Sequence, residues 1–144
     1  MKHLFVDRRG YAMAYNAIVF VTVALPMLIL SSEITRALYV NVNIQTAVDA
    51  ACAAAVQAVD VPHFVATGEL VLDSNFASLY AQQEFDATVT NSNIHQYSPA
   101  LSGIGIVNNT IAECHASATM TWMLPGIPAL TMNVVSAAEA LARR

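Results

Sequence analysis

The hydrophobic positions of the chain begin with one long run. Residues 11–32 contain no charged side chain, and the first charge after them is Glu33. At about 1.5 Å per residue, a helix over this run is about 33 Å long, while the hydrocarbon core of a bilayer is about 30 Å thick. Arg8 and Arg9 precede the run, and the positive-inside rule places such an end in the cytoplasm. The pattern therefore predicts a single-pass membrane anchor whose C-terminal part lies outside the cytoplasm.

A cleavable secretory signal is the alternative interpretation of this run. Such a signal has an apolar stretch of about 7–15 residues followed by a small-residue cleavage site. Here the apolar stretch is longer and continues directly into further helix-forming sequence, so a retained anchor is favoured. Pro26 lies within the run and predicts a local kink in the helix.

The helical pattern continues past the apolar run. Residues 33–58 are rich in alanine, the best helix former, and the first helix breaker after them is Pro62. Apolar residues recur along this segment at helical spacings: Leu38, Ile44, Val48, Ala51 and Ala55. We therefore expect one rod over residues 11–58, about 70 Å long by the rise per residue. Because the alanine-rich face of its outer half is too apolar to remain in water, a folded head is expected to pack against it.

Strict alternation of apolar and polar residues predicts strands further along the chain. Over residues 114–122 the apolar side chains share one face: Cys114, Ala116, Ala118, Met120 and Trp122. Leu130, Met132 and Val134 repeat the alternation. The segment 124–128 between the two runs contains two prolines and a glycine, which predicts a chain reversal. These features predict an antiparallel sheet.

Two further strands and a short helix are also expected. Residues 85–90 alternate between apolar and polar side chains, and residues 104–111 form a strand diluted by glycine and asparagine. A short helix is expected over residues 76–83. Its N-cap is expected to be one of three neighbouring polar residues, Asp73, Ser74 or Asn75.

An alternative interpretation makes residues 118–142 a second membrane helix. The proline and glycine residues in the middle of that segment and its two-residue alternation weigh against it. The predicted fold class is therefore α+β, with a long N-terminal membrane-spanning helix that continues into a small antiparallel β-sheet head. The expected boundaries are a basic cytoplasmic leader over 1–10, the long helix over 11–58 and an extracytoplasmic α+β head over 59–144.

Composition and charge restrict the class of function. The chain has 144 residues, of which 56% are hydrophobic and 11% charged, and its formal net charge is −4. Soluble globular proteins carry about 25% charged residues, so the composition argues against a disordered chain and an ordinary cytosolic enzyme. No Lys or Arg occurs between Arg36 and Arg143, whereas eight acidic residues do. Such a segment cannot neutralise phosphates, which excludes nucleic acid as a partner.

The two cysteines lie in segments expected outside the cytoplasm, where disulfides persist. Cys52 is on the outer half of the helix, and Cys114 is on the apolar face of a predicted strand. In the chain-entropy model a disulfide that closes a loop of about 60 residues stabilises the fold by about 4 kcal/mol. Two buried free thiols are the alternative, and the sequence leaves the choice open.

The remaining candidate residues point to packing. Glu33 and Arg36 share one helical face, so they can pair with each other or with a neighbouring subunit. Gln45 and Asp49 form a polar stripe that is either solvated or placed between helices. The four histidines lack a second ligand at helical spacing, and no catalytic triad or phosphate-binding glycine loop is recognisable. We therefore expect no enzyme activity, metal, cofactor or small-molecule substrate.

Several of these segments together resemble a known family. Arg8-Arg9-Gly10 comes first, and Leu25-Pro26 lies in the apolar run. Glu33, Arg36 and Tyr39 follow, and then the run IQTAVDAACAAA over residues 44–55. In this order they resemble the N-terminal module of TadE/TadG-like proteins, the pilin-like components of the tight-adherence (Flp) pilus system. The resemblance covers residues 8–58 well and residues 110–142 loosely.

The resemblance implies a non-enzymatic, pilin-like subunit or assembly component of a surface pilus, anchored in a bacterial cytoplasmic membrane. Its partners would be the membrane and, through helix packing, copies of itself or other pilin-like subunits. The residues implied in packing and assembly are Glu33, Arg36, Tyr39, Gln45 and Asp49. A single-pass accessory subunit of an unrelated membrane complex is the alternative function.

The resemblance also bears on processing of the N-terminus. Gly10 corresponds to the residue before the leader cleavage site of prepilins. The chain departs from the pattern of cleaved prepilins at the fifth position after it, where Tyr15 stands in place of a glutamate. The sequence therefore leaves open whether the leader is removed.

Overall fold

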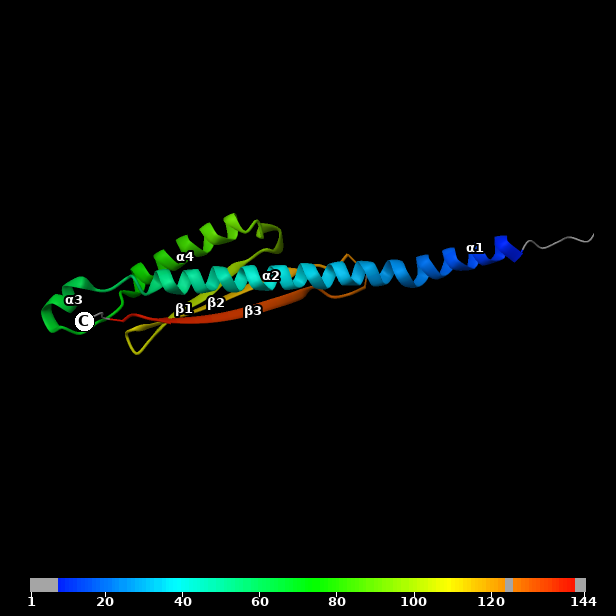
Figure 1. Ribbon diagram of the computed structural model, residues 1–144. Helices are drawn as coiled ribbons and strands as arrows, with labels where there is room; N and C mark the ends of the chain where they lie inside the picture. Colours follow the sequence, from blue (N-terminus) through cyan, green and yellow to red (C-terminus); the bar gives the residue numbers. More distant parts are fainter. Residues whose placement is uncertain (1–7, 124–125, 142–144) are drawn as a thin grey trace, which may run out of the picture. The chain divides into compact units, whose positions relative to one another are not determined.

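The structure is a computed structural model that describes residues 8–123 and 126–141. The chain divides into two compact units, Met1–Arg36 and Ala37–Arg144. The fold is α+β, with one long apolar N-terminal helix followed by a small antiparallel three-stranded sheet (Figure 1). The α+β class and the order of helix and sheet are therefore confirmed.

The first unit is helical throughout its described part. Helix α1 (Arg8–Val19) is followed by a π-helical segment, η1 (Phe20–Ala24), and by the start of α2 (Leu25–Ala55). In this segment the N–H of Leu25 donates to the carbonyl of Phe20, five residues earlier. Pro26 explains the position of the wide turn, because proline has no N–H and its ring crowds the carbonyl four residues before it. The structure thus has a π-helical segment just ahead of Pro26, where the sequence predicted a local kink.

The second unit contains the rest of α2 and two shorter helices. Helix α3 spans Val61–Thr67, helix α4 spans Ser74–Asn91, and a 3-10 turn, η2, spans His95–Tyr97. The side chain of Asp73 caps α4 by accepting hydrogen bonds from the backbone N–H groups of Asn75 and Phe76. The expected cap is thus confirmed at Asp73.

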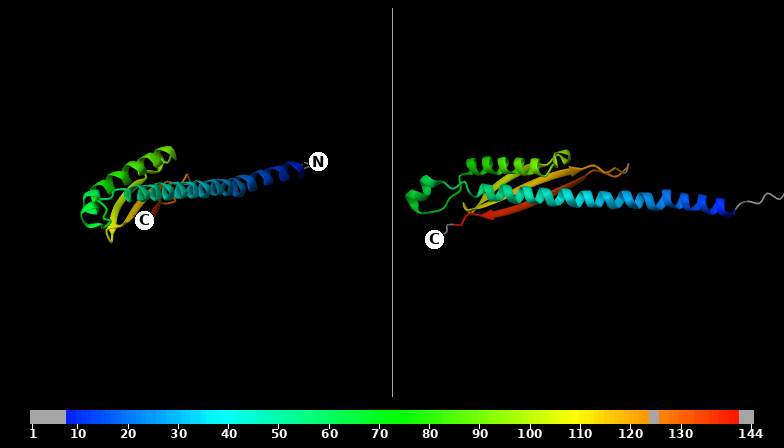
Figure 2. Two further views of the ribbon diagram at one scale, coloured as in Figure 1. Left: turned by 60° about the vertical axis from the view of Figure 1, so that its left-hand side comes forward. Right: turned by 45° about the horizontal axis from the view of Figure 1, so that its top comes forward.

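The sheet of the second unit has the strand order β1-β2-β3, and both pairings are antiparallel. Strand β1 spans Ala100–Val107, β2 spans Ile111–Met120 and β3 spans Leu130–Glu139. The part of α2 that belongs to the second unit and helix α4 lie over one face of the sheet (Figure 2), and the other face is largely exposed. An antiparallel sheet covered on one side only is expected to alternate between apolar and polar residues.

Strands β2 and β3 follow the alternation predicted from the sequence. The side chains on the inner face of β2 are all buried: Ala112, Cys114, Ala116, Ala118 and Met120. On β3, Met132 and Val134 are buried in the same way. Both predicted strands are confirmed, although β2 ends at Met120 and Trp122 lies just beyond it.

The connection between these two strands was predicted at residues 124–128. Leu124 and Pro125 lie outside the described residues. Met120 pairs with Leu130, so the chain does reverse between them. The two strands contradict the alternative of a second membrane helix over residues 118–142.

The strand predicted over residues 104–111 is wrong at its C-terminal end. Asn108 and Asn109 have φ angles of 53° and 64°, in the left-handed region that asparagine tolerates better than most residues. The chain therefore turns there, and Ile111 already belongs to β2. The first strand begins at Ala100, earlier than the glycine-containing pattern indicated.

The strand predicted over residues 85–90 is also wrong, because these residues belong to helix α4. Phe85 and Val89 are four residues apart and lie on the same helical face as two buried alanines, Ala77 and Ala81. The short helix predicted over residues 76–83 is the first half of this longer helix. A period of four over the whole helix fits the buried positions better than a period of two over six residues.

Helix α2 contributes the largest group of core side chains. Val40, Ile44, Val48, Cys52 and Ala55 are buried at intervals of three or four residues. Of the stripe predicted from the sequence, only Leu38 is wrong, because its side chain is 60% exposed. The helix ends at Ala55 and not at residue 58.

We expect Phe85→Ala to lower the free energy of unfolding of the full chain by about 3–5 kcal/mol, because it removes a buried ring from the helix–sheet core. Leu79→Ala, on the exposed side of the same helix, is the matched control and should lower it by about 1 kcal/mol or less. Denaturant unfolding in detergent measures both. Equal effects of the two substitutions would contradict the helical assignment of residues 85–90.

Candidate functional site

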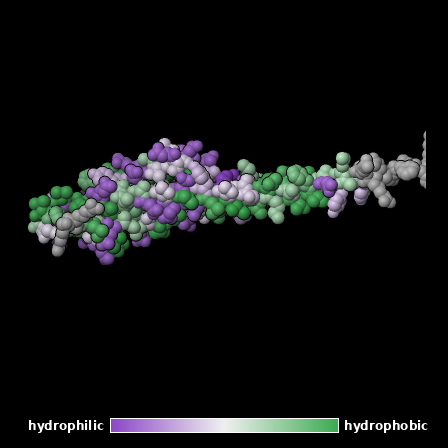
Figure 3. Space-filling model, viewed as in Figure 1, coloured by the Kyte–Doolittle hydropathy of each residue, from purple (hydrophilic) through white to green (hydrophobic). Residues whose placement is uncertain are grey.

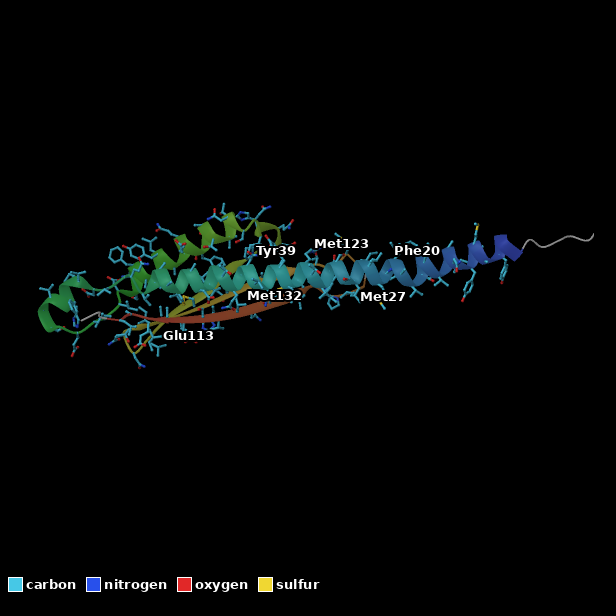
Figure 4. All side chains as sticks on the ribbon, in the orientation of Figure 1. Phe20, Met27, Tyr39, Glu113, Met123 and Met132 are labelled. Carbon is cyan, nitrogen blue, oxygen red and sulfur yellow. A yellow bond between two sulfur atoms is a disulfide. The ribbon has the colours of Figure 1, made fainter. Side chains whose placement is uncertain are left out.

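Between residues 11 and 30, the helix of the first unit exposes large apolar side chains around its circumference. Twelve large apolar side chains in its helix are between 41% and 76% exposed: Tyr11, Met13, Tyr15, Ile18, Val19, Phe20, Val21, Val23, Leu25, Met27, Leu28 and Leu30. Apart from the two tyrosines, which this hydropathy scale ranks as mildly hydrophilic, these residues belong to the green stretch of the helix in Figure 3, and Phe20 and Met27 project from it in Figure 4. A helix that is hydrophobic all round is normally found inside a protein core or in a membrane.

Within the described residues, one helix is long and apolar enough to cross a membrane, Tyr11–Ala55. This criterion concerns length and composition, and a core helix of a soluble protein or a signal sequence also meets it. Only 6% of its most apolar window is buried in the protein, which is unlike a core helix. The helix therefore presents an apolar surface that the residues described in the structure leave uncovered.

Two hydroxyl groups in the apolar segment, those of Thr22 and Ser32, bond to the helix backbone. Thr22 Oγ1 donates to the carbonyl of Ile18 at 2.7 Å, and Ser32 Oγ donates to the carbonyl of Ile29 at 2.8 Å. Such bonds let a hydroxyl enter an apolar surrounding at low cost. Asn16 differs, because its exposed amide has no hydrogen bond to any described residue.

Glu33, the first charge after the apolar segment, pairs with Arg36. Arg36 Nη1 lies 3.2 Å from Glu33 Oε1, and the two residues are three apart on α2. The Glu33 side chain is 1% exposed. A buried carboxylate needs a counter-charge, because desolvation of an unpaired ion is costly. The structure thus pairs these two residues within one subunit.

The other residues implied in assembly lie on α2 in the second unit and have partners there. The Tyr39 hydroxyl donates to the carbonyl of Ser92 at 3.0 Å, beyond the end of α4 (Figure 4 labels Tyr39). Gln45 Nε2 donates to Asp49 Oδ1 at 2.9 Å, one helical turn away. Tyr39 and Asp49 remain exposed, so both are accessible to a neighbouring molecule.

A disulfide joins Cys52 of α2 to Cys114 of β2. Their Cα atoms are 5.8 Å apart, and both side chains are fully buried. The bond links residues 62 positions apart in the sequence, so it fixes the helix to the middle strand of the sheet. The chain-entropy model gives a stabilisation of about 4 kcal/mol for a loop of this length. The sequence left this pairing open.

Over residues 8–123 and 126–141, no group of three His, Cys, Asp or Glu side chains is arranged to hold a metal ion. His115 and Glu113 meet on the exposed face of β2, where Nε2 and Oε1 are 3.7 Å apart. Gly10, the residue before the cleavage point that the sequence leaves open, lies within helix α1.

Sequence reasoning missed two exposed aromatic residues on α4. Phe76 is 53% exposed and Tyr80 is 40% exposed, and their ring centroids are 6.2 Å apart. Their spacing of four residues in a helix is the only signal that could have found them. Aromatic residues are enriched at protein interfaces relative to the rest of the surface.

Comparison with known proteins finds no match: no family model, no curated protein and no solved structure corresponds to this chain.

We expect the chain isolated from cells to resist thiol alkylation until it is reduced, because both cysteines are in a buried disulfide. A Cys52→Ala/Cys114→Ala variant should be less stable by about 4 kcal/mol in denaturant unfolding. The Ser78→Ala variant serves as the control, since Ser78 is exposed on α4. Alkylation of both thiols in the unreduced native chain would contradict the disulfide.

Proposed function

We propose that this chain is a non-enzymatic, pilin-like subunit or assembly component of a Tad/Flp-type surface pilus, held in a bacterial cytoplasmic membrane by its N-terminal helix. The observation that carries the proposal is the exposed apolar surface of residues 11–32. A membrane and a bundle of like helices are the two surroundings that suit such a helix. The helix of a pilin-like subunit lies in the membrane before assembly and in a bundle of like helices after it.

Charge and redox chemistry support export of the second unit. Arg8 and Arg9 flank the N-terminal end of the apolar segment, whereas the chain from Ala37 to Ala142 has no Lys or Arg. The positive-inside rule retains the basic end in the cytoplasm. The Cys52–Cys114 disulfide belongs to an oxidising compartment, in agreement with a head outside the cytoplasm.

The apolar segment also carries chemistry for helix packing. Small residues such as Ala17 let two helix backbones approach closely, and an asparagine side chain hydrogen-bonds across a helix pair. Asn16 has an unused amide among the described residues and stands beside Ala17. In a bilayer the neighbouring copy is the most direct partner for that amide.

The proposal is tested by a photo-crosslinking amino acid at position 21 of the full chain in the cells that produce it. We expect crosslinks to other copies or to other pilin-like subunits. Asn16→Leu should lower the yield of crosslinked copies about threefold, since an interhelical hydrogen bond in a bilayer contributes about 0.6 kcal/mol.

Thr22→Val is the matched control for that variant. Its hydroxyl already bonds to the carbonyl of Ile18 within the same helix, so the yield should stay unchanged. Crosslinks confined to one unrelated membrane protein in fixed ratio would contradict the pilus role and indicate an accessory subunit.

A further inference from the structure

A groove lies between the C-terminal end of α2 and the N-terminal half of α4. Its larger part has a volume of about 500 Å³. Alanine methyl groups of α2 line one side, at Ala50, Ala53 and Ala54, and Tyr80 and Glu84 line the other. Because the alanine side chains are short, the groove gives access close to the helix backbone.

A smaller part of about 280 Å³ continues the groove along α4. It shares Tyr80 and Gln57 with the larger part and adds Phe76 as a second aromatic wall. The groove therefore has an apolar, aromatic end and an end that carries polar groups. Tyrosine is among the residues that contribute most to binding at protein interfaces.

Glu84 sets the charge of the polar end. Its carboxylate is exposed and has no hydrogen bond or ion pair to any residue that the structure describes. The segment between Arg36 and Arg143 contains eight acidic residues and no Lys or Arg. The described part of the second unit therefore offers no Lys or Arg to this carboxylate, and its acidic surface disfavours the same part of a second copy. An occupant must bring the positive charge.

We propose that this groove binds a partner protein through an Arg or Lys side chain that lies next to a bulky apolar side chain. The alanine methyl groups pack against the aliphatic stem of the basic residue. Its charged end meets the Glu84 carboxylate and the face of the Tyr80 ring, an ion pair combined with a cation–π contact. The apolar neighbour occupies the smaller part of the groove beside Phe76.

This inference does not depend on the pilus role, because the groove is formed entirely by residues of the second unit. The crosslinks at position 21 report on the apolar helix, whereas binding in the groove reports on the head. If the crosslinks are not observed, the groove proposal is unaffected, and if the groove does not bind the peptide, the pilus proposal is unaffected.

The test uses the full chain in detergent micelles and two hexapeptides, acetyl-Ala-Ala-Arg-Leu-Ala-Ala-amide and its counterpart with Gln in place of Arg. Amide chemical shifts measured by NMR should change at Ala53, Tyr80 and Glu84 with the arginine peptide, and much less with the glutamine peptide. Glu84→Gln should weaken binding of the arginine peptide about three- to tenfold. Raising the salt from about 0.05 M to about 0.5 M should weaken it as well.

Asp86→Asn is the matched control for Glu84→Gln. It removes the same charge from the same helix, but Asp86 accepts a hydrogen bond from Gln82 and does not line the groove. Equal affinities of the two peptides, or of the native chain and Glu84→Gln, would overturn the proposal. Binding of spermidine as tight as that of the arginine peptide would also overturn it, because it would indicate a free polyamine instead of a protein.

Discussion

Exposure of the apolar N-terminal helix is the constraint on which the other features depend. Complete burial of a large apolar side chain is worth about 1.5–3 kcal/mol. The twelve between Tyr11 and Leu30 are partly covered by the helix itself, so removing the rest of their surface from water is worth on the order of 10–20 kcal/mol. The whole stability of a small domain is about 5–15 kcal/mol. A surrounding that covers this helix therefore contributes a free energy as large as the whole free energy of folding of a small domain such as the head.

The second unit, in contrast, has a hydrophobic core of its own. The buried faces of α2, α4 and β2 form one core, and the disulfide between Cys52 and Cys114 links the longest helix to the middle strand. Its described surface carries acidic groups without a Lys or Arg to balance them. This division of properties, an apolar anchor and an acidic folded head, is what the proposed role in a membrane or a filament needs.

The sequence predicted those elements whose pattern has a single interpretation. Strand β2 alternates between apolar and polar residues from Cys114 to Met120, and Pro125 and Gly126 follow a few residues later, so this part of the strand could be predicted. In α4, Phe85 and Val89 satisfy both a period of two and a period of four. Only the buried Ala77 and Ala81 decide between them, and alanine gives too weak a hydrophobic signal to be noticed.

Among the candidate sites, those formed by neighbours in the sequence could be predicted, and those formed by tertiary packing could not. The apolar run and the Glu33–Arg36 pair depend on neighbours in the sequence, so spacing along one helix was enough to find them. The disulfide depends on the packing of α2 against β2, which brings together residues 62 positions apart. The groove depends on how α4 lies against α2. The alanine residues that line it cannot be distinguished in the sequence from the alanine residues of a buried helix face.

The most direct measurement is the reactivity of single introduced cysteines toward a membrane-impermeant maleimide in intact spheroplasts. The account predicts rapid labelling of Ser78→Cys in the head, labelling of Lys2→Cys only after lysis, and no labelling of Val21→Cys in either case. Labelling of Val21→Cys in intact spheroplasts as fast as Ser78→Cys would show that the apolar helix lies in water, and would contradict the account.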